Sequence, residues 1–153
     1  MASQPDPLQR RGWPQTESLT ALRALINEAI HANHVVARRA GISVSELLTL
    51  AHLSMEEIGP AEIARRLAVT APAATIIVDK LVARGYAERQ PHESDRRRTD
   101  LVISEAGRTA VVTQMLPMFL ALDAVDRALE DDEREVVTRY LGAVLEAYQR
   151  LRD

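Results

Sequence analysis

The run most suited to specific chemistry is Ser94-Asp95-Arg96-Arg97-Arg98, three consecutive arginines behind an aspartate. An arginine guanidinium is charged at any working pH and is slim enough to enter a DNA minor groove, where narrow A·T tracts concentrate negative potential. An aspartate two residues before an arginine can hold that side chain, or the loop, in shape through a charge-assisted hydrogen bond. The alternative is an exposed loop without a specific role. The run therefore makes a nucleic acid the first candidate partner.

Two short strands flank this arginine run. Residues 86–90 and 99–104 have strand-like composition, and the segment between them, residues 91–98, is polar and rich in turn formers. Two short strands around a loop of this length predict a β-hairpin. The arginines would then lie at the hairpin tip.

A pair of helices precedes the hairpin. The sequence predicts a short helix over residues 60–67, a turn over 68–70 and a longer helix over 71–84, which Gly85 ends. The buried stripe of the longer helix consists of apolar residues at helical spacing: Ala74, Ile77, Val78 and Leu81. A short helix, a tight turn and a second amphipathic helix form a helix-turn-helix, whose second helix enters the major groove. A hairpin directly after that helix is a wing.

Four further segments complete the expected fold. Helical periodicity covers residues 17–40 and 43–55, and Ser43 with Glu46 forms a capping-box pattern at the start of the second segment. A long helix is expected over residues 104–125, with a kink at Pro117, and a last helix follows the acidic run 130–133. The fold class is therefore mainly α with a small β-hairpin.

Composition narrows the class of protein. The chain has 153 residues, 46% of them hydrophobic but only 3% aromatic, which favours a core of aliphatic side chains on packed helices. It has no cysteine, so disulfides, thiolate metal sites and a cysteine redox sensor are excluded. No uninterrupted run of 18 apolar residues is present, and residues 1–16 resemble a flexible arm rather than a secretory signal. We therefore expect a cytoplasmic protein that does not contact a membrane.

The net charge of −3 argues weakly against a nucleic-acid binder, but its distribution is uneven. Residues 61–100 contain eight basic and six acidic residues, so this segment carries +2 and the remainder −5. The asymmetry is modest and is also compatible with an ordinary solvated surface.

The residues resemble those of a known family. Residues 63–70, followed by 74–81 and 84–89, are similar to the DNA-binding core of the MarR family of winged helix-turn-helix transcriptional regulators. The wing signature of that family, an aspartate, any residue and an arginine, matches Asp95 and Arg97. A Leu-Thr-Glu-Lys-Gly-like helix start follows the wing, here as residues 103–107. The resemblance covers roughly residues 17–151, and the wing signature is its specific part.

This resemblance implies a homodimer that acts as a sequence-specific DNA-binding regulator, most often a repressor. The implied organisation is a flexible arm over residues 1–16, a winged helix-turn-helix domain over 43–104, and dimerisation helices over 17–42 and 105–153. The broad apolar side of the last helix agrees with dimerisation, although an intramolecular core is the alternative. The partners would be double-stranded DNA, a second copy of the chain, and a small aromatic or anionic effector.

The expected DNA contacts fall into three groups, namely the wing residues, the outward residues of the helix over 71–84, and phosphate contacts. The expected phosphate contacts are Arg65, Arg66, Lys80 and Arg84. By resemblance, Arg97 enters the minor groove, Asp95 orients it, and Arg96 and Arg98 contact phosphates or pack on the hairpin. The helix over residues 71–84 would face base edges, where Ile76 and Ala73 replace the Arg and the Ser or Thr of many relatives and can touch thymine methyl groups instead. The full set of expected DNA-binding residues is Arg65, Arg66, Thr70, Ala71, Pro72, Ala73, Thr75, Ile76, Lys80, Arg84, Asp95, Arg96, Arg97 and Arg98.

A small-ligand site is expected only by analogy with the family. Its candidate lining residues are Asn27, His31, His34, Met55, Met115 and Phe119. His31 and His34, with Glu28, have a spacing that can bind a metal, but without a denser cluster of ligands we expect neither a metal site nor a cofactor.

Two other classes of function agree less well with the sequence. A helical protein-interaction domain with weak non-specific DNA binding is the alternative, because the second helix of the helix-turn-helix is poor in polar groups. An enzyme is not expected, because the sequence contains no Ser–His–Asp pattern, no glycine-rich phosphate loop and no metal motif.

Overall fold

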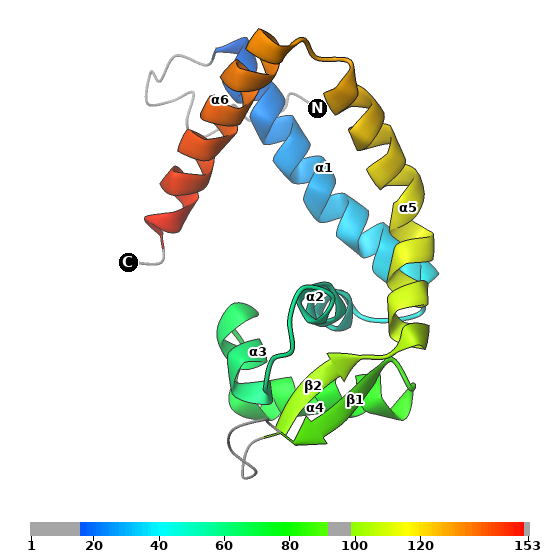
Figure 1. Ribbon diagram of the computed structural model, residues 1–153. Coiled ribbons are helices and arrows are strands. Elements are labelled where there is room, and N and C mark those ends of the chain that lie inside the picture. The colour runs from blue at the N-terminus through cyan, green and yellow to red at the C-terminus, as the bar shows by residue number, and fades with distance from the viewer. Residues whose placement is uncertain (1–15, 92–98, 152–153) are drawn as a thin grey trace, which may run out of the picture. The chain divides into compact units, whose positions relative to one another are not determined.

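The computed structural model describes residues 16–91 and 99–151 (Figure 1). In chain order the elements are α1 (Glu17–Arg39), α2 (Val44–Leu53), α3 (Pro60–Arg66), α4 (Ala71–Ala83), β1 (Ala87–Pro91), β2 (Thr99–Ile103), α5 (Glu105–Arg127) and α6 (Asp131–Gln149). The mainly helical fold with one small hairpin is thus confirmed. The chain divides into two compact units, one ending at Val111 and the other beginning at Val112. The first unit holds α1 together with the winged helix-turn-helix, and the expected division into DNA-binding and dimerisation regions stays a prediction.

Short-range hydrogen bonds fix the helix starts where the sequence predicts them. Thr16 caps α1, its Oγ1 accepting from the Leu19 amide at 3.2 Å. At α2, the Glu46 amide donates to Ser43 Oγ at 3.2 Å and the Ser43 amide donates to Glu46 Oε2 at 2.6 Å, which confirms the capping box. Each cap satisfies amides that a helix leaves without an internal partner, so these boundaries depend on local sequence alone.

The core of the first unit is aliphatic, and side chains from several helices and from β2 build it together. Leu50 of α2, Ile63 of α3, Val78 and Leu81 of α4, and Leu101 of β2 are each no more than 1% exposed. Ala74 of the predicted stripe is also fully buried, whereas Ile77 is only half-buried. Burying such side chains stabilises a fold by about 1.5–3 kcal/mol each, so this shared cluster fixes the orientation of α4 and the hairpin.

The hairpin is antiparallel, with pairs running from Ala87↔Ile103 to Pro91↔Thr99. The strands lie within one residue of the predicted ranges. A further bridge joins Ile58 to Leu101, whose amide donates to the Ile58 carbonyl at 3.0 Å. The segment between α2 and α3 therefore pairs with the free edge of β2 and fixes the hairpin to the helix-turn-helix.

A tight junction connects the hairpin to α5. The Ser104 hydroxyl donates to the Gly85 carbonyl at 2.6 Å and accepts from the Gly107 amide at 3.0 Å. Gly107 is buried, and a Cβ added there would lie 2.1 Å from the Tyr86 carbonyl oxygen. The Ser and Gly of the family-like helix start thus have physical roles, because Ser104 caps α5 and only glycine allows this approach to Tyr86.

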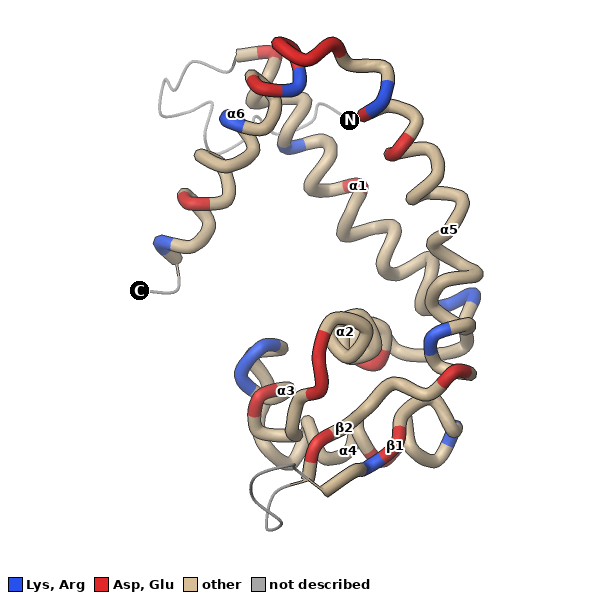
Figure 2. The backbone as a smooth tube through the Cα atoms, in the orientation of Figure 1, with Lys and Arg blue, Asp and Glu red and all other residues tan. Residues whose placement is uncertain are grey.

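The second unit contains most of α5 and all of α6, and both helices expose apolar side chains. Charged residues are absent from α5 between Arg108 and Asp123 (Figure 2). In α6, whose residues are all described, none is buried within the chain. The exposed apolar residues of this unit are Val112, Leu116, Met118, Phe119, Leu120, Leu122, Val125, Val136, Val137, Tyr140, Leu141, Leu145, Tyr148 and Leu151. An exposed apolar surface of this extent is typical of a surface that another protein covers.

One described helix, α5, is long and apolar enough to cross a membrane by length and composition, with a mean hydropathy of 1.2 over 18 residues. The helix contains no uninterrupted apolar run of 18 residues, because polar residues such as Thr113 and Gln114 interrupt it. The same composition suits a helix covered by a second protein surface.

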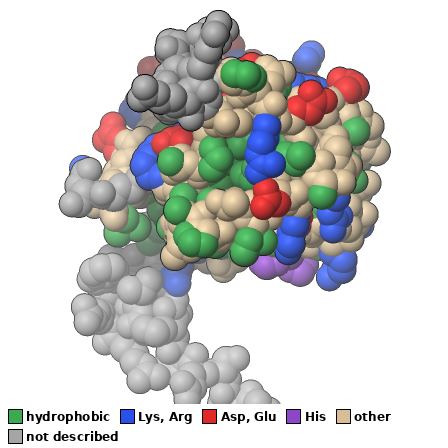
Figure 3. Space-filling model, turned by 90° about the horizontal axis from the view of Figure 1, so that it is seen from below, with side chains coloured by type: hydrophobic (Ala, Val, Ile, Leu, Met, Phe, Trp, Pro, Cys, Tyr) green, Lys and Arg blue, Asp and Glu red, His purple; other side chains and the backbone are tan. Residues whose placement is uncertain are grey.

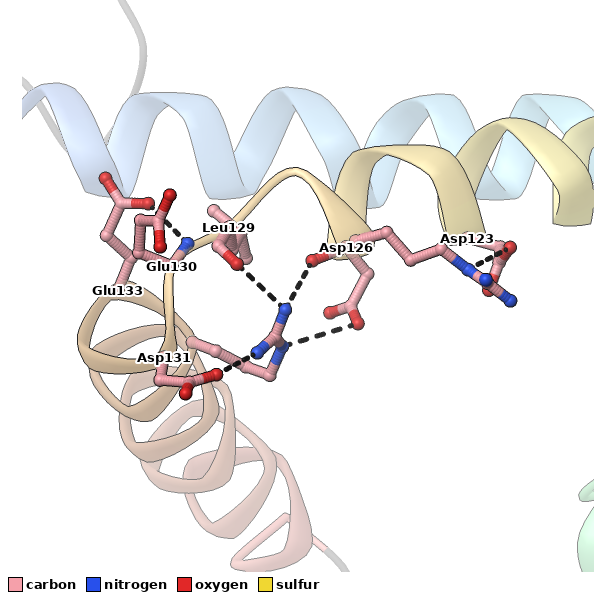
Figure 4. A network of polar contacts seen from close by, with 8 residues as sticks. Asp123, Asp126, Leu129, Glu130, Asp131 and Glu133 are labelled. Atoms are coloured by element: carbon pink, nitrogen blue, oxygen red, sulfur yellow. Dashed lines mark hydrogen bonds and ion pairs between the residues drawn. The ribbon is translucent and has the colours of Figure 1, made fainter.

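Arg134 holds the connection between α5 and α6 (Figure 4). Its guanidinium donates to the carbonyls of Asp126 and Leu129, at 3.1 and 2.8 Å, and to the carboxylate of Asp131 at 2.9 Å. The Glu130 amide donates to Glu133 Oε2 at 2.9 Å. These bonds satisfy carbonyls at the end of one helix and an amide at the start of the next, so they define the turn between the two helices.

Gly107→Ala is expected to lower the free energy of unfolding by about 1–3 kcal/mol or more, because the new methyl group overlaps the Tyr86 backbone. Urea denaturation followed by circular dichroism measures the change. Ala106→Ser, at the exposed neighbouring position, is the control and should change stability by less than about 0.5 kcal/mol. Equal stability of Gly107→Ala and the wild type would contradict the close approach.

Candidate nucleic-acid interface

A compact turn joins α3 to α4. The Val69 amide donates to the Ala64 carbonyl at 3.0 Å, and Ala68 adopts a positive φ of 52°. The Thr70 hydroxyl then accepts from the Ala73 amide at 3.4 Å and caps α4. Together with the buried contacts of Ile63 and Ala74, this turn leaves the opposite side of α4 free to face outward.

The outward side of α4 carries small and apolar side chains. Its exposed residues are Ala71, Pro72, Thr75, Ile76, Asp79, Lys80 and Ala83, whereas Ala73 is half-buried. Thr75 donates its hydroxyl hydrogen to the Ala71 carbonyl at 3.1 Å. The Thr75 oxygen can still accept a hydrogen bond, but α4 offers bases few donors. Figure 3, seen from the side of α3, α4 and the hairpin, shows hydrophobic side chains near the centre of this face with charged ones among them.

An ion pair connects α4 to the hairpin. Arg89 Nη2 of β1 lies 2.5 Å from Asp79 Oδ1 of α4, and both side chains are substantially exposed. Exposed pairs contribute little to stability, about 0–1 kcal/mol. This pair instead neutralises the carboxylate of Asp79 on the outward side of α4, and it holds β1 beside that helix.

Glu62 binds both arginines at the end of α3. Its carboxylate accepts from Arg65 Nε and Nη2, at 2.8 and 2.5 Å, and from Arg66 Nε at 2.6 Å. Arg66 also pairs with Glu56 at 2.9 Å. Hydrogen bonds from the two guanidinium groups lower the pKa of Glu62 from 4.5 to about 2. Arg65 and Arg66, both predicted phosphate contacts, are therefore paired with a carboxylate in the free chain.

His52 lies half-buried beside this cluster. Burial, followed by the positive charge of Arg66, lowers the pKa of its imidazole below 6.5. The neutral form therefore prevails near neutral pH, so the positive charge of this region comes from arginine.

Arg84 makes bonds within the protein. Its Nη1 donates to the Gly41 carbonyl at 2.6 Å, and its Nε lies 3.9 Å from Oε1 of the buried Glu46. This arrangement ties the end of α4 to the turn between α1 and α2. It competes with the phosphate contact expected for Arg84, whereas Lys80 is exposed on the outward side of α4.

The wing-tip residues Asp95, Arg96, Arg97 and Arg98 lie outside the described residues. The strands that carry the tip are described, and their last pair is Pro91↔Thr99. The two strand ends, at Pro91 and Thr99, are therefore neighbours.

The predicted effector residues are not assembled within one unit. Asn27, His31, His34 and Met55 are exposed in the first unit, and Met55 is 85% exposed. Met115 and Phe119 belong to the second unit. Within the described ranges, no group of three or more His, Asp or Glu side chains could hold a metal ion. The effector site stays a prediction.

The arrangement of α3, turn, α4 and a hairpin against α4 defines a winged helix-turn-helix DNA-binding domain. The MarR family model matches residues 40–98. The chain is 28% identical to the HTH-type transcriptional repressor YetL of Bacillus subtilis over 143 residues, 89% of this chain and 85% of that protein. It is 32% identical to the transcriptional repressor MprA of Escherichia coli over 66% of this chain and 65% of that protein.

Solved structures share the fold. A mutant of S. aureus MepR bound to an oligodeoxyribonucleotide superposes with a TM-score of 0.58 at 17% identity, covering 88% of this chain and 99% of that chain. MarR of E. coli in its apo form gives a TM-score of 0.60 at 21% identity, covering 86% and 99%. Together these matches support a MarR family regulator. The chain is a DNA-binding transcriptional regulator and not an enzyme.

Two features of the interface were not predicted from the sequence. The contacts of Glu62 with Arg65 and Arg66 follow the i, i+3 and i, i+4 spacing that brings helical side chains together. This spacing is present in the sequence, so these two ion pairs could have been predicted from it. The Asp79–Arg89 pair joins a helix to a strand ten residues later, and no local pattern indicates it.

The ion pairs of Glu62 predict a pH-dependent contribution to stability. Because its pKa is lowered on folding, the contribution is fully present above about pH 4.5 and is lost as the pH falls towards about 2. Glu62→Gln should remove this part of the pH dependence of the unfolding free energy, measured by urea titration between pH 2 and 7. Glu57→Gln, at an exposed neighbouring position, should keep the wild-type dependence. A Glu62 carboxyl that titrates near 4.5 by NMR would contradict the pairing.

Proposed function

We propose that the chain is a homodimeric, sequence-specific repressor that holds DNA between α4 in the major groove and the wing in the minor groove. The observation that carries the proposal is the position of the hairpin. It follows α4 directly, pairs with residue 58 on its outer edge, and is joined to α4 through Asp79 and Arg89. In this proposal Arg97 enters the minor groove and Asp95 orients it, because arginine suits the negative potential of a narrow groove.

Repression rather than activation is supported by the relatives. YetL and MprA are both named repressors, and the similarity to YetL extends over 89% of this chain. A repressor needs no further surface for recruiting polymerase, since occupying the operator is sufficient. Release by a small aromatic or anionic ligand is also part of the proposal, on the basis of family resemblance.

The exposed apolar residues support the homodimer. In α6, Val137, Leu141, Leu145 and Tyr148 recur at helical spacing and are 38–57% exposed. Arg139 lies on the other side of the helix from Leu141, since two residues correspond to a rotation of about 200°. A second copy of the chain supplies a surface of the same apolar character, and closed two-fold dimers are the commonest soluble assemblies.

Arg97→Ala is expected to weaken operator binding at least about tenfold and to reduce the salt dependence by about one phosphate equivalent. The weaker binding is expected because the variant loses one guanidinium from the minor groove. Mobility shift with the chain's own upstream DNA at several salt concentrations measures the affinity and its salt dependence.

Arg139→Ala removes the same charge from α6 and should bind DNA like the wild type. Equal, weak binding of the wild type and Arg97→Ala to every duplex would reject the wing assignment. That result would favour the alternative, a helical protein-interaction domain with weak non-specific DNA binding.

Leu141→Glu is expected to convert the dimer into monomers, because it introduces a charge into the proposed apolar interface. Sedimentation equilibrium should give twice the chain mass of 17.0 kDa for the wild type and the mass of one chain for the variant. Arg139→Glu, on the other side of α6, is the matched control and should remain dimeric. A wild type that sediments as a monomer, or that partitions into membranes, would disprove the proposed interface.

A further inference from the structure

The outward side of α4 lacks the side chains that usually read bases by hydrogen bonding. Arginine or lysine makes the bidentate contacts to guanine, and asparagine or glutamine makes those to adenine; of these residue types α4 contains only Lys80. The two hydroxyls of this region are partly engaged, since Thr70 accepts from the Ala73 amide and Thr75 donates to the Ala71 carbonyl. Direct reading by polar contacts is therefore poor on this helix.

The charged residues of α4 do not replace these contacts. Asp79 is paired with Arg89, which lies on β1. Lys80 stands one turn beyond Ile76, and its flexible ammonium is a point charge suited to a phosphate. Of the two, only Lys80 can donate to a guanine, and it lacks the fixed planar donor fork of an arginine.

An apolar patch occupies the place where base contacts are expected. Ile76 is 55% exposed, although the core of the same unit is closed and aliphatic. Pro72 lies one turn before Ile76 and is also exposed, so the two side chains are neighbours on the helix surface. Thymine is the base that presents an apolar group, its C5 methyl, in the major groove.

We propose that Ile76, together with Pro72, recognises thymine methyl groups, so that α4 selects A·T pairs in its part of each half-site. This inference rests on the proposed function, because it assumes that α4 lies in the major groove. The patch distinguishes thymine from cytosine by the methyl group that it covers. Specificity then depends on burial of apolar surface at these positions rather than on hydrogen bonds.

Replacing thymine by deoxyuridine tests the inference, because the exchange removes the C5 methyl and leaves every hydrogen-bonding group in place. A duplex is first selected from a random-sequence pool by the full-length chain, and each thymine is then replaced singly. One or two replacements per half-site should raise Kd about three- to fivefold, the effect of exposing one methyl-sized group. In Ile76→Ala the same replacements should have a much smaller effect, which identifies Ile76 as the main contacting side chain.

Two further variants separate this inference from the proposed function. Ile76→Val keeps part of the apolar contact and should keep part of the deoxyuridine effect. Arg97→Ala should bind more weakly overall and keep the full effect, because it acts in the other groove. If the wild type selects a sequence but tolerates every deoxyuridine, or if Ile76→Ala is equally sensitive, the inference is wrong and the proposed function stands. If the wild type selects no sequence, both are wrong.

Discussion

The orientation of α4 and of the hairpin strands depends on one shared aliphatic core. With almost no aromatic residues available, the first unit is closed by branched side chains from α2, α3, α4 and β2 that exclude solvent together. Because Val78 and Leu81 point into this core, residues half a turn away on α4 must point out. The same core includes Leu101, whose backbone also pairs with residue 58. Burial therefore determines both which side of α4 is presented and where the hairpin begins.

The ion pairs of the arginines add direction and only a modest amount of stability. The pairs around Glu62, between Asp79 and Arg89, and around Arg84 involve at least partly exposed arginines, for which solvent screens most of the attraction. Their contribution is geometric, because each guanidinium is held at a defined place relative to the helix-turn-helix. The buried Glu46 illustrates this, since one of its oxygens caps α2 while the other faces Arg84 at the end of α4.

Local chemistry made much of the fold predictable. The Ser43–Glu46 capping box, the Thr70 cap and the end of α4 at Gly85, with its positive φ, follow from neighbouring residues, so the sequence places them correctly. The contact between Arg84 and Gly41 joins residues 43 positions apart and depends on how α2 and α4 pack, which no periodicity reveals. The apolar character of the outward side of α4 was predictable, because a residue such as Ile76 can be read directly from the sequence. The long-range contacts of its neighbours cannot be read in this way.

The pairing of Arg65 and Arg66 with Glu62 has a consequence for how the protein searches a genome. A phosphate that approaches either guanidinium must compete with a carboxylate already in contact. Random DNA, which offers only phosphates, therefore gains less from α3 than it would from two unpaired arginines. Non-specific sites outnumber an operator by about a million or more. A shorter residence time at each of these sites therefore leaves more of the protein available to bind the operator.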